Sequence, residues 1–277
     1  MKRIMSIQDI SCLGKCSLTA ALPIISAFGV ETCIVPTAVL STHTQFKDFT
    51  FRDLTEDLDG IREHWKKENF QFDALYTGYL GSKEQIDIVI DYFDTFKNDN
   101  NVIIVDPAMA DDGKLYTGFD SDFPLAMAKL CGKADIILPN ISEAAFMVGE
   151  TYPGENCNHE TIKDLLLKLA RLGSKKVVIT GVKGNDDTFG FMGYDTDSGD
   201  FFEGFTKEIP YRSHGTGDVF ASTFTGALMK DYSISDALML AANFTCRCIE
   251  DTYKDPDRRF YAVNFESQLP WLIHEIS

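Results

Sequence analysis

Short apolar runs recur along the chain and alternate with longer amphipathic segments. The apolar runs predict β-strands, and the amphipathic segments predict helices, most clearly at residues 159–172, where isoleucine and leucine recur at helical spacing. Strands that alternate with helices indicate βαβ units and a mainly parallel sheet with helices on both faces. The predicted strands cover residues 3–7, 32–36, 74–77, 102–105, 136–138 and 177–180.

The pattern changes after Lys183. Apolar runs at 189–194 and 201–205 flank a polar, turn-forming stretch, which predicts an antiparallel hairpin. We therefore expect an α/β fold, a three-layer α/β/α sandwich whose mainly parallel central sheet carries an antiparallel hairpin at one edge. No repeat or linker interrupts the chain, so residues 1–277 are expected to form one domain. The helices predicted after the hairpin cover residues 218–230, 234–250 and 266–276.

The charge balance excludes some classes of partner. The 277 residues include 42 acidic and 26 basic side chains, a net charge of −16, and both nucleic acids and anionic membranes need a basic face. The seven cysteines lack the spacing of a disulfide framework or a zinc site, which favours reduced thiols. Neither a signal peptide nor a membrane-spanning run is evident, so we expect a cytoplasmic protein.

The most informative segment is Gly215-Thr216-Gly217-Asp218, which directly precedes an apolar helical run. Glycines let the backbone approach a ligand closely, and the free N–H groups of a helix start attract an anion. An aspartate there can accept the proton of an attacking hydroxyl while a phosphate rests on those N–H groups. This combination is typical of a small-molecule kinase, although an aspartate in this position is often only a helix cap.

Polar residues also follow the predicted strands, where the carboxyl ends of parallel strands form the usual ligand site. Carboxylate, hydroxyl, imidazole and phenol groups occur there, and together they suit a small polar ring as substrate. Ordinary connecting loops contain the same residue types, so the pattern alone leaves both interpretations open. The residues expected to line a substrate pocket are Asp9, Ser41, His43, Thr44 and Tyr79.

Asn140 and Glu143 stand three residues apart at a predicted helix start and therefore face the same way. Their oxygens suit Mg²⁺ or its waters, but the same spacing is typical of a capping box, and the two roles can coexist. Asp106 ends the fourth strand, where a carboxylate can orient a cation. The polar segment 107–120 behind it is long enough to cover a site. Residues 180–184 form a turn that could lie beside a nucleotide.

The order of these motifs along nearly the whole chain resembles one family, the pyridoxal and pyridoxamine kinases of vitamin B6 salvage within the ribokinase-like superfamily. The Gly-Thr-Gly-Asp loop is similar to the superfamily's signature, and the Asn-x-x-Glu pair is similar to its Mg²⁺ motif. Two further segments are more specific to the B6 kinases, the Ser-Thr-His-Thr and Thr-Gly-Tyr stretches. The matching segments are 41–44, 77–79, 106–109, 113–116, 140–143 and 215–218.

This resemblance implies a ribokinase-like fold and ATP-dependent phosphorylation of the 5′-hydroxymethyl group of pyridoxal, pyridoxamine or pyridoxine. It also implies Mg²⁺, K⁺ and a homodimer. Asp218 would be the catalytic base, and Gly215, Thr216 and Gly217 would form the anion hole. The implied nucleotide-binding residues are Asp106, Tyr116, Asn140, Thr180, Gly181 and Thr216, and the implied metal-binding residues are Glu143 and Asp106.

Three positions depart from the B6-kinase pattern. Asp9 replaces a serine that holds a ring substituent, and a carboxylate there prefers an amine or a protonated ring nitrogen. Leu138 and Gly181 replace a threonine and a serine on the nucleotide side. Two alternatives therefore stay open within this fold: a hydroxymethylpyrimidine kinase of thiamine synthesis, which Asp9 also resembles, and a protein that binds a B6 vitamer without turnover. A dinucleotide-dependent oxidoreductase is disfavoured, because the first loop lacks the glycine fingerprint.

Overall fold

A computed structural model describes residues 1–185 and 187–277. Its centre is a nine-stranded sheet in the order β11-β10-β9-β8-β5-β4-β1-β2-β3. The interior strands consist almost wholly of buried apolar residues, as expected of a parallel sheet covered on both faces. The strands are β1 (Arg3–Ser11), β2 (Glu31–Leu40), β3 (Phe51–Asp53), β4 (Ala74–Thr77), β5 (Val102–Val105), β8 (Ile136–Ile137), β9 (Lys176–Lys183), β10 (Thr188–Asp195) and β11 (Phe201–Lys207).

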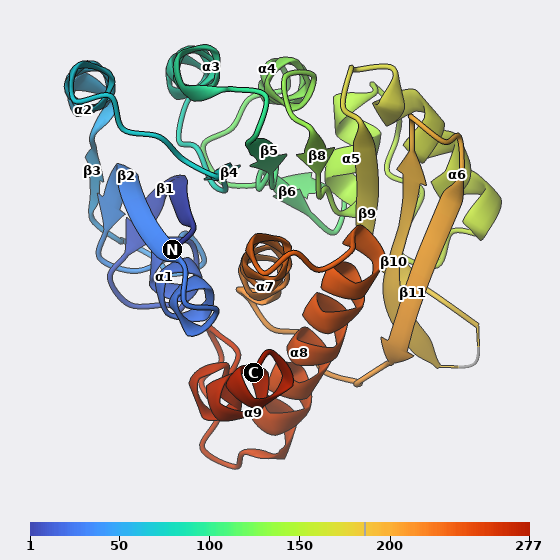
Figure 1. Cartoon of the computed structure of the whole chain (residues 1–277). Coiled ribbons are helices and arrows are strands. Elements are labelled where there is room, and N and C mark those ends of the chain that lie inside the picture. Colours follow the sequence, from blue (N-terminus) through green and yellow to red (C-terminus); the bar gives the residue numbers. More distant parts are fainter. Residues whose placement is uncertain (186) are drawn as a thin grey trace.

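Helices cover both faces of this sheet (Figure 1). Helices α2 to α6 lie on one face, and α1, α7, α8 and α9 lie on the other. Each layer encloses its own apolar core, one around Leu75 and Ile137, the other around Phe224 and Phe244. The helices are α1 (Leu18–Ala27), α2 (Thr55–Lys67), α3 (Lys83–Phe96), α4 (Phe123–Cys131), α5 (Ile141–Met147), α6 (His159–Ala170), α7 (Thr216–Met229), α8 (Ile234–Lys254) and α9 (Leu269–Glu275), which follows a short 3₁₀ turn at Glu266–Gln268.

Strand pairing confirms the predicted fold class. Strands β2, β1, β4, β5, β8 and β9 run parallel, and β10 and β11 form the expected antiparallel hairpin at one edge. The opposite edge was not predicted: β3 pairs antiparallel with the end of β2. This short strand has exposed residues and no apolar run, so the sequence has no periodic signal for it.

Several strands are longer than predicted, and one extension matters for the site. Strand β1 continues through Asp9 to Ser11, whereas the sequence placed Asp9 in the loop behind the strand. The prediction of this boundary was wrong because β1 is central, and pairing with β2 continues after the apolar run ends. The pairing register shifts between Gln8 and Ile10, so the strand is irregular around Asp9.

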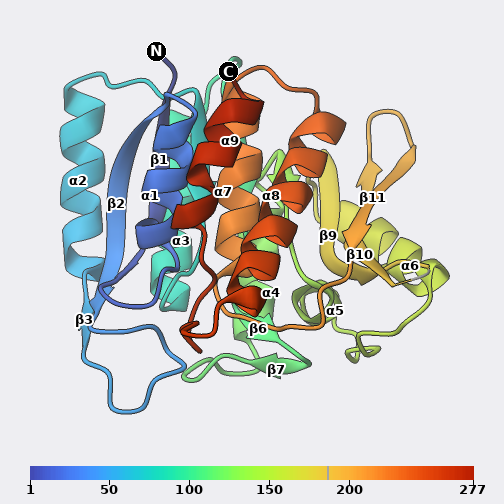
Figure 2. The same ribbon diagram turned by 90° about the horizontal axis from the view of Figure 1, so that it is seen from below.

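The segment 107–120 forms a small hairpin of its own, β6 (Ala110–Asp111) and β7 (Lys114–Leu115). Figure 2 shows this hairpin beyond the carboxyl ends of the parallel strands, beside the loop that follows β2. All seven cysteines are free thiols. Among the described residues, no helix combines the length and apolar character needed to cross a bilayer.

Candidate active site

Two adjoining pockets lie at the carboxyl ends of the parallel strands. The larger, here called the nucleotide cleft, has a volume of about 410 Å³ and lies against α5, β9, β10 and the start of α7. The smaller, here called the acceptor pocket, has a volume of about 110 Å³ and lies between β1, the loop after β2 and the loop after β4. Asp218, Gly215, His214, Tyr116, Asp111 and Ala108 line both.

The start of α7 forms the boundary between the two pockets. Gly215 caps the helix in the left-handed conformation at φ 79°, and a side chain there would stand 2.7 Å from the Lys15 carbonyl oxygen. Only glycine fits this position without strain. Helical hydrogen bonding begins with Val219 N–H donating to the Gly215 carbonyl. The N–H groups of Thr216, Gly217 and Asp218 therefore lack helical acceptors and can hold an anion.

Asp218 stands in the first turn of this helix and faces both pockets. Burial, and after it the neighbouring Asp9 carboxylate, raise the pKa of its carboxyl to about 7, while a hydrogen bond from the Ser17 N–H opposes the shift. A carboxylate with a raised pKa is a better proton acceptor near neutral pH than an ordinary aspartate. The group is thus suited to take a proton from an acceptor held in the smaller pocket.

The acceptor pocket has a buried carboxylate on its wall. Asp9 is 2% exposed, and it accepts a hydrogen bond from the Ser11 hydroxyl at 2.9 Å. Burial raises the pKa of Asp9 despite this bond. Tyr79 forms another wall and stacks on Phe119 at a centroid distance of 5.6 Å. An aromatic face beside a buried carboxylate suits a ring that bears an amine or a protonated nitrogen.

Of the three residues expected from the loop after β2, two reach the acceptor pocket. His43 and Thr44 line it. The His43 ring packs against the backbone of Gly14, and its Nε2 lies 3.0 Å from the Tyr261 carbonyl oxygen. Ser41 is exposed and is not part of either pocket lining, and its hydroxyl instead accepts a hydrogen bond from Thr50 N–H at 2.9 Å.

Glu143 and Asn140 form a complete capping box at the start of α5. Glu143 Oε2 accepts from Asn140 N–H at 2.8 Å, and Asn140 Oδ1 accepts from Glu143 N–H at 3.0 Å. The other carboxylate oxygen, Oε1, accepts from Met109 N–H at 3.0 Å and so holds the segment 107–120 in place. The capping box, which the sequence left open as one of two roles for this pair, is therefore present. Both side chains also line the nucleotide cleft.

Asp106 lies close to this pair and in front of Gly217. It is 8% exposed, and burial, Glu143 and Asp218 together raise its pKa well above the ordinary range. Within the described residues, no donor forms a hydrogen bond to its carboxylate. A buried carboxylate without a partner beside a second one favours a cation between them. The described residues contain no group of three or more His, Cys, Asp or Glu side chains placed to hold a metal ion.

The remaining predicted nucleotide residues lie on the walls of the same cleft. The prediction of a turn at residues 180–184 was wrong, because β9 continues to Lys183; Thr180 and Gly181 therefore belong to this strand, where Gly181 adopts φ 74°, and both line the cleft near Phe189. Tyr116 follows β7 and lines both pockets. Leu138, one of the departures from the family pattern, is 3% exposed and belongs mainly to the apolar core, with one edge at the cleft.

Comparison with known proteins decides the family. The sequence profile of the family described as phosphomethylpyrimidine kinase matches residues 16–259. The chain belongs to the phosphomethylpyrimidine kinase family. Membership makes this protein a kinase, a phosphotransferase that uses ATP, and it confirms the family resemblance predicted from the motifs.

Three members illustrate the range of this kinase family. A Bacteroides thetaiotaomicron protein, provisionally assigned as a phosphomethylpyrimidine kinase and crystallised with pyridoxal, is 36% identical, with a TM-score of 0.92 over 99% of this chain and 95% of its own. The pyridoxal kinase PdxY of Corynebacterium diphtheriae is 27% identical over 96% of this chain and 94% of its own length. The hydroxymethylpyrimidine/phosphomethylpyrimidine kinase of Bacillus subtilis is also 27% identical, over 82% of this chain and 80% of its own.

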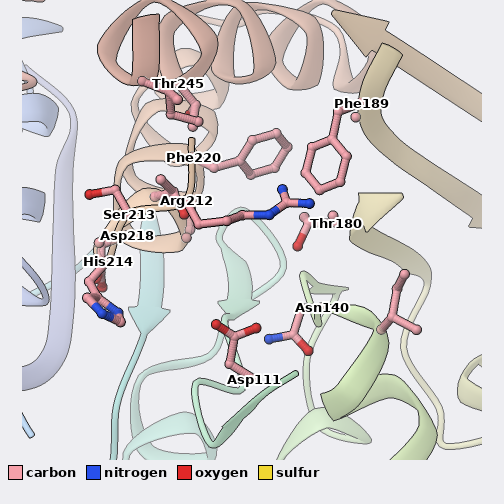
Figure 3. A pocket seen from close by; sticks show the side chains of 18 of the residues that line it. Asp111, Asn140, Thr180, Phe189, Arg212, Ser213, His214, Asp218, Phe220 and Thr245 are labelled. Atoms are coloured by element: carbon pink, nitrogen blue, oxygen red, sulfur yellow. The ribbon is translucent and has the colours of Figure 1, made fainter. Parts of the chain in front are cut away.

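Several residues of this kinase line the pockets but were not predicted from the sequence. Ser11, Cys16, Ser17, Leu40 and Gln45 also line the acceptor pocket. In the nucleotide cleft, Figure 3 shows Phe189 and Phe220 on one side and the side chain of Arg212 crossing the cavity towards them. The sequence signal at Arg212 is weak: it is one arginine in the polar connection between the β10–β11 hairpin and the Gly-Thr-Gly-Asp loop.

Proposed function

We propose that this protein transfers the γ-phosphoryl group of ATP to the 5′-hydroxymethyl group of pyridoxal, pyridoxamine or pyridoxine. One observation carries the proposal: Asp218 and the open start of α7 line the acceptor pocket and the nucleotide cleft together. A hydroxyl bound on one side thereby meets a phosphate bound on the other, and phosphoryl transfer depends chiefly on such positioning.

In this proposal Asp218 accepts the hydroxyl proton as the new oxygen–phosphorus bond forms and ADP departs. Its raised pKa favours proton transfer, because a base is most effective when its pKa is close to the working pH. The N–H groups of Thr216 and Gly217 stabilise the oxygens of the transferring phosphoryl group. Such preorganised donors usually supply the larger part of the rate enhancement.

Mg²⁺, when bound, would supply the positive charge that offsets the charge of the phosphates. Asp106 would hold it, directly or through water, because its buried carboxylate has no donor among the described residues. Glu143 would act mainly through water or through the position of Asp106, since both of its oxygens already accept backbone hydrogen bonds. The segment 107–120, which Glu143 anchors, would keep water from the phosphoryl group through Tyr116 at the boundary of the pockets.

The acceptor pocket supports a B6 vitamer as the ring substrate. Tyr79 offers an aromatic face, and the buried carboxylate of Asp9 favours an amine or a ring proton. The pyridoxal complex of the Bacteroides thetaiotaomicron relative supports the same choice. A second candidate is phosphorylation of a hydroxymethylpyrimidine, which the family description and the Bacillus subtilis relative favour.

A substrate panel tests the proposal. ADP release by the purified protein with Mg²⁺ and K⁺ would be followed with pyridoxal, pyridoxamine, pyridoxine and hydroxymethylpyrimidine in separate reactions. We expect kcat/KM to be highest with a B6 vitamer. Turnover with hydroxymethylpyrimidine alone would support the second candidate function. Tight binding of a vitamer with no ADP release would show that the protein is a carrier.

A further inference from the structure

The nucleotide cleft is unusually acidic for a site that receives a polyphosphate. Its lining contains carboxylates from the loop after β5, from α5, from β6 and from the loop before α6, and the basic side chains among the described lining residues are Lys207 and Arg212. The chain as a whole carries a net charge of −16, so the surrounding surface offers little compensation. Attraction of a phosphate chain therefore depends strongly on each cation that enters the cleft.

Arg212 is one of these two cations, and its side chain extends into the cleft. Figure 3 shows its side chain lying across the cavity, with Phe189 and Phe220 on one side and Thr180, Asn140 and Asp111 on the other. The guanidinium carbon lies 4.9 Å from the centroid of the Phe189 ring, a cation–π contact that keeps the group inside the cleft. Arg212 also stands three residues before Gly215, so it belongs to the same connection as the anion-binding start of α7.

Two carboxylates restrain the guanidinium. It forms an ion pair with Glu155, from the loop between α5 and α6, and lies 3.9 Å from Glu208, which follows β11. The Arg212 side chain is 59% exposed, and ion pairs this exposed contribute little net stability. A phosphate can offer the same guanidinium two charge-assisted hydrogen bonds in parallel, which is a stronger interaction.

We propose that Arg212 is a nucleotide-binding residue that exchanges Glu155 for the phosphate chain of ATP or ADP when the nucleotide enters the cleft. The proposal rests on the proposed kinase function and adds a residue to its binding site. Glu155 then competes with the nucleotide for the guanidinium. Removal of the Glu155 charge should tighten nucleotide binding, and removal of the Arg212 charge should weaken it.

The test is ADP binding by calorimetry to the full-length protein and to the variants Arg212→Gln, Arg212→Lys, Glu155→Gln and Arg212→Gln/Glu155→Gln. Arg212→Gln should raise the Kd about 10- to 100-fold, the scale of a lost bidentate charge-assisted pair, and Arg212→Lys should recover part of the loss. Glu155→Gln should lower the Kd about twofold to fivefold alone and leave it unchanged in the Arg212→Gln background.

Arg247→Gln is the matched control. The Arg247 guanidinium carbon lies 4.6 Å from the centroid of the Trp271 ring, outside the cleft lining. The variant loses the same charge as Arg212→Gln, so its Kd for ADP should equal that of the wild type. Thermal unfolding of each variant verifies folding. If Arg212→Gln binds ADP as the wild type does, or if Glu155→Gln tightens binding equally without Arg212, the assignment of Arg212 is overturned and the kinase proposal stands. If the wild type binds no ADP, both are overturned.

Discussion

The two pockets meet at Asp218 but are built differently. The acceptor pocket is small, and its lining comes from β1, the loops after β1, β2 and β4, the segment 107–120 and the start of α7. The nucleotide cleft is nearly four times larger, about 410 against 110 Å³, and is bordered by the antiparallel hairpin and by long connecting segments. One pocket has the dimensions for a single ring, and the other has room for an extended ligand.

Electrostatics separates the two pockets as well. On the acceptor side the carboxylate that belongs to this pocket alone is Asp9, since Asp111 and Asp218 are shared with the cleft, whereas the cleft gathers many carboxylates around one entering guanidinium, Arg212. The first arrangement selects a cationic or hydrogen-donating ligand. The second admits a polyphosphate only together with cations. Choice of acceptor and binding of nucleotide are therefore expected to depend on separate residues, with chemistry confined to their shared boundary.

The largest effect is expected at that boundary. Asp218→Asn should lower kcat by about 10²- to 10⁴-fold, the usual cost of losing a general base, while both KM values change little. Steady-state kinetics with each substrate varied in turn would measure this. A variant with near-normal kcat would show that Asp218 is not the base.

Two alanine substitutions in the same loop should differ in stability. Gly215→Ala forces a side chain into the left-handed conformation and to within 2.7 Å of the Lys15 carbonyl, which should lower the free energy of unfolding by about 2 kcal/mol. A side chain at Gly217 would have its closest contact 4.0 Å away, at Asp106 Oδ2. Gly217→Ala should therefore change the free energy of unfolding by less than about 0.5 kcal/mol. Chemical denaturation measures both, and equal losses would refute this view of the loop.

The two pockets should respond independently to substitution. Asp9→Asn removes the charge that faces the ring and should raise the acceptor KM about tenfold, more for pyridoxamine than for pyridoxal, because only pyridoxamine carries the amine. The Kd for ADP should be unchanged. Coupled kinetics and calorimetry test this together, and a parallel loss of ADP affinity would mean that the pockets are not separate.

The smallest effect concerns stability and pH. The pKa of Asp218 is raised from its ordinary 3.8 to about 7, so between these values the folded state keeps a proton that the unfolded chain has lost. The contribution of this group to stability is therefore greatest below about pH 4 and declines as pH rises towards 7. The Tm of Asp218→Asn relative to wild type should increase by a few degrees between pH 5 and pH 8. A constant difference would show that the carboxyl has an ordinary pKa.

Local signals were sufficient to predict the boundary of the two pockets. Gly215 and Asp218 lie within four residues of each other at the start of α7, and the roles predicted for them rest on helix-terminus chemistry. Asn140 and Glu143 were likewise placed correctly at a helix start beside the cleft, because a capping box is a local pattern. The alternation of apolar runs predicted the parallel sheet and the hairpin, because it too is a local pattern.

Contacts between distant segments could not be predicted. His43 is held by the Tyr261 carbonyl, 218 residues away in the sequence, and Arg212 is directed by Phe189 and Glu155 from two other elements. Ser41 was expected to line the pocket with His43 and Thr44, but its hydroxyl accepts a hydrogen bond from Thr50 N–H instead. Asp9 was assigned to a loop because a polar residue normally ends an apolar strand, whereas pairing with β2 continues to Ser11 and extends β1 through it.

Direct detection of the product tests the central claim most sharply. Wild-type protein and Asp218→Asn would each be mixed with stoichiometric ATP, Mg²⁺ and pyridoxal, and the vitamer would be followed by mass spectrometry. We predict conversion to the 5′-phosphate by the wild type, with the rate lowered about 10²- to 10⁴-fold in the variant. Absence of phosphorylated vitamer with the wild type, or equal rates in both proteins, would contradict the account.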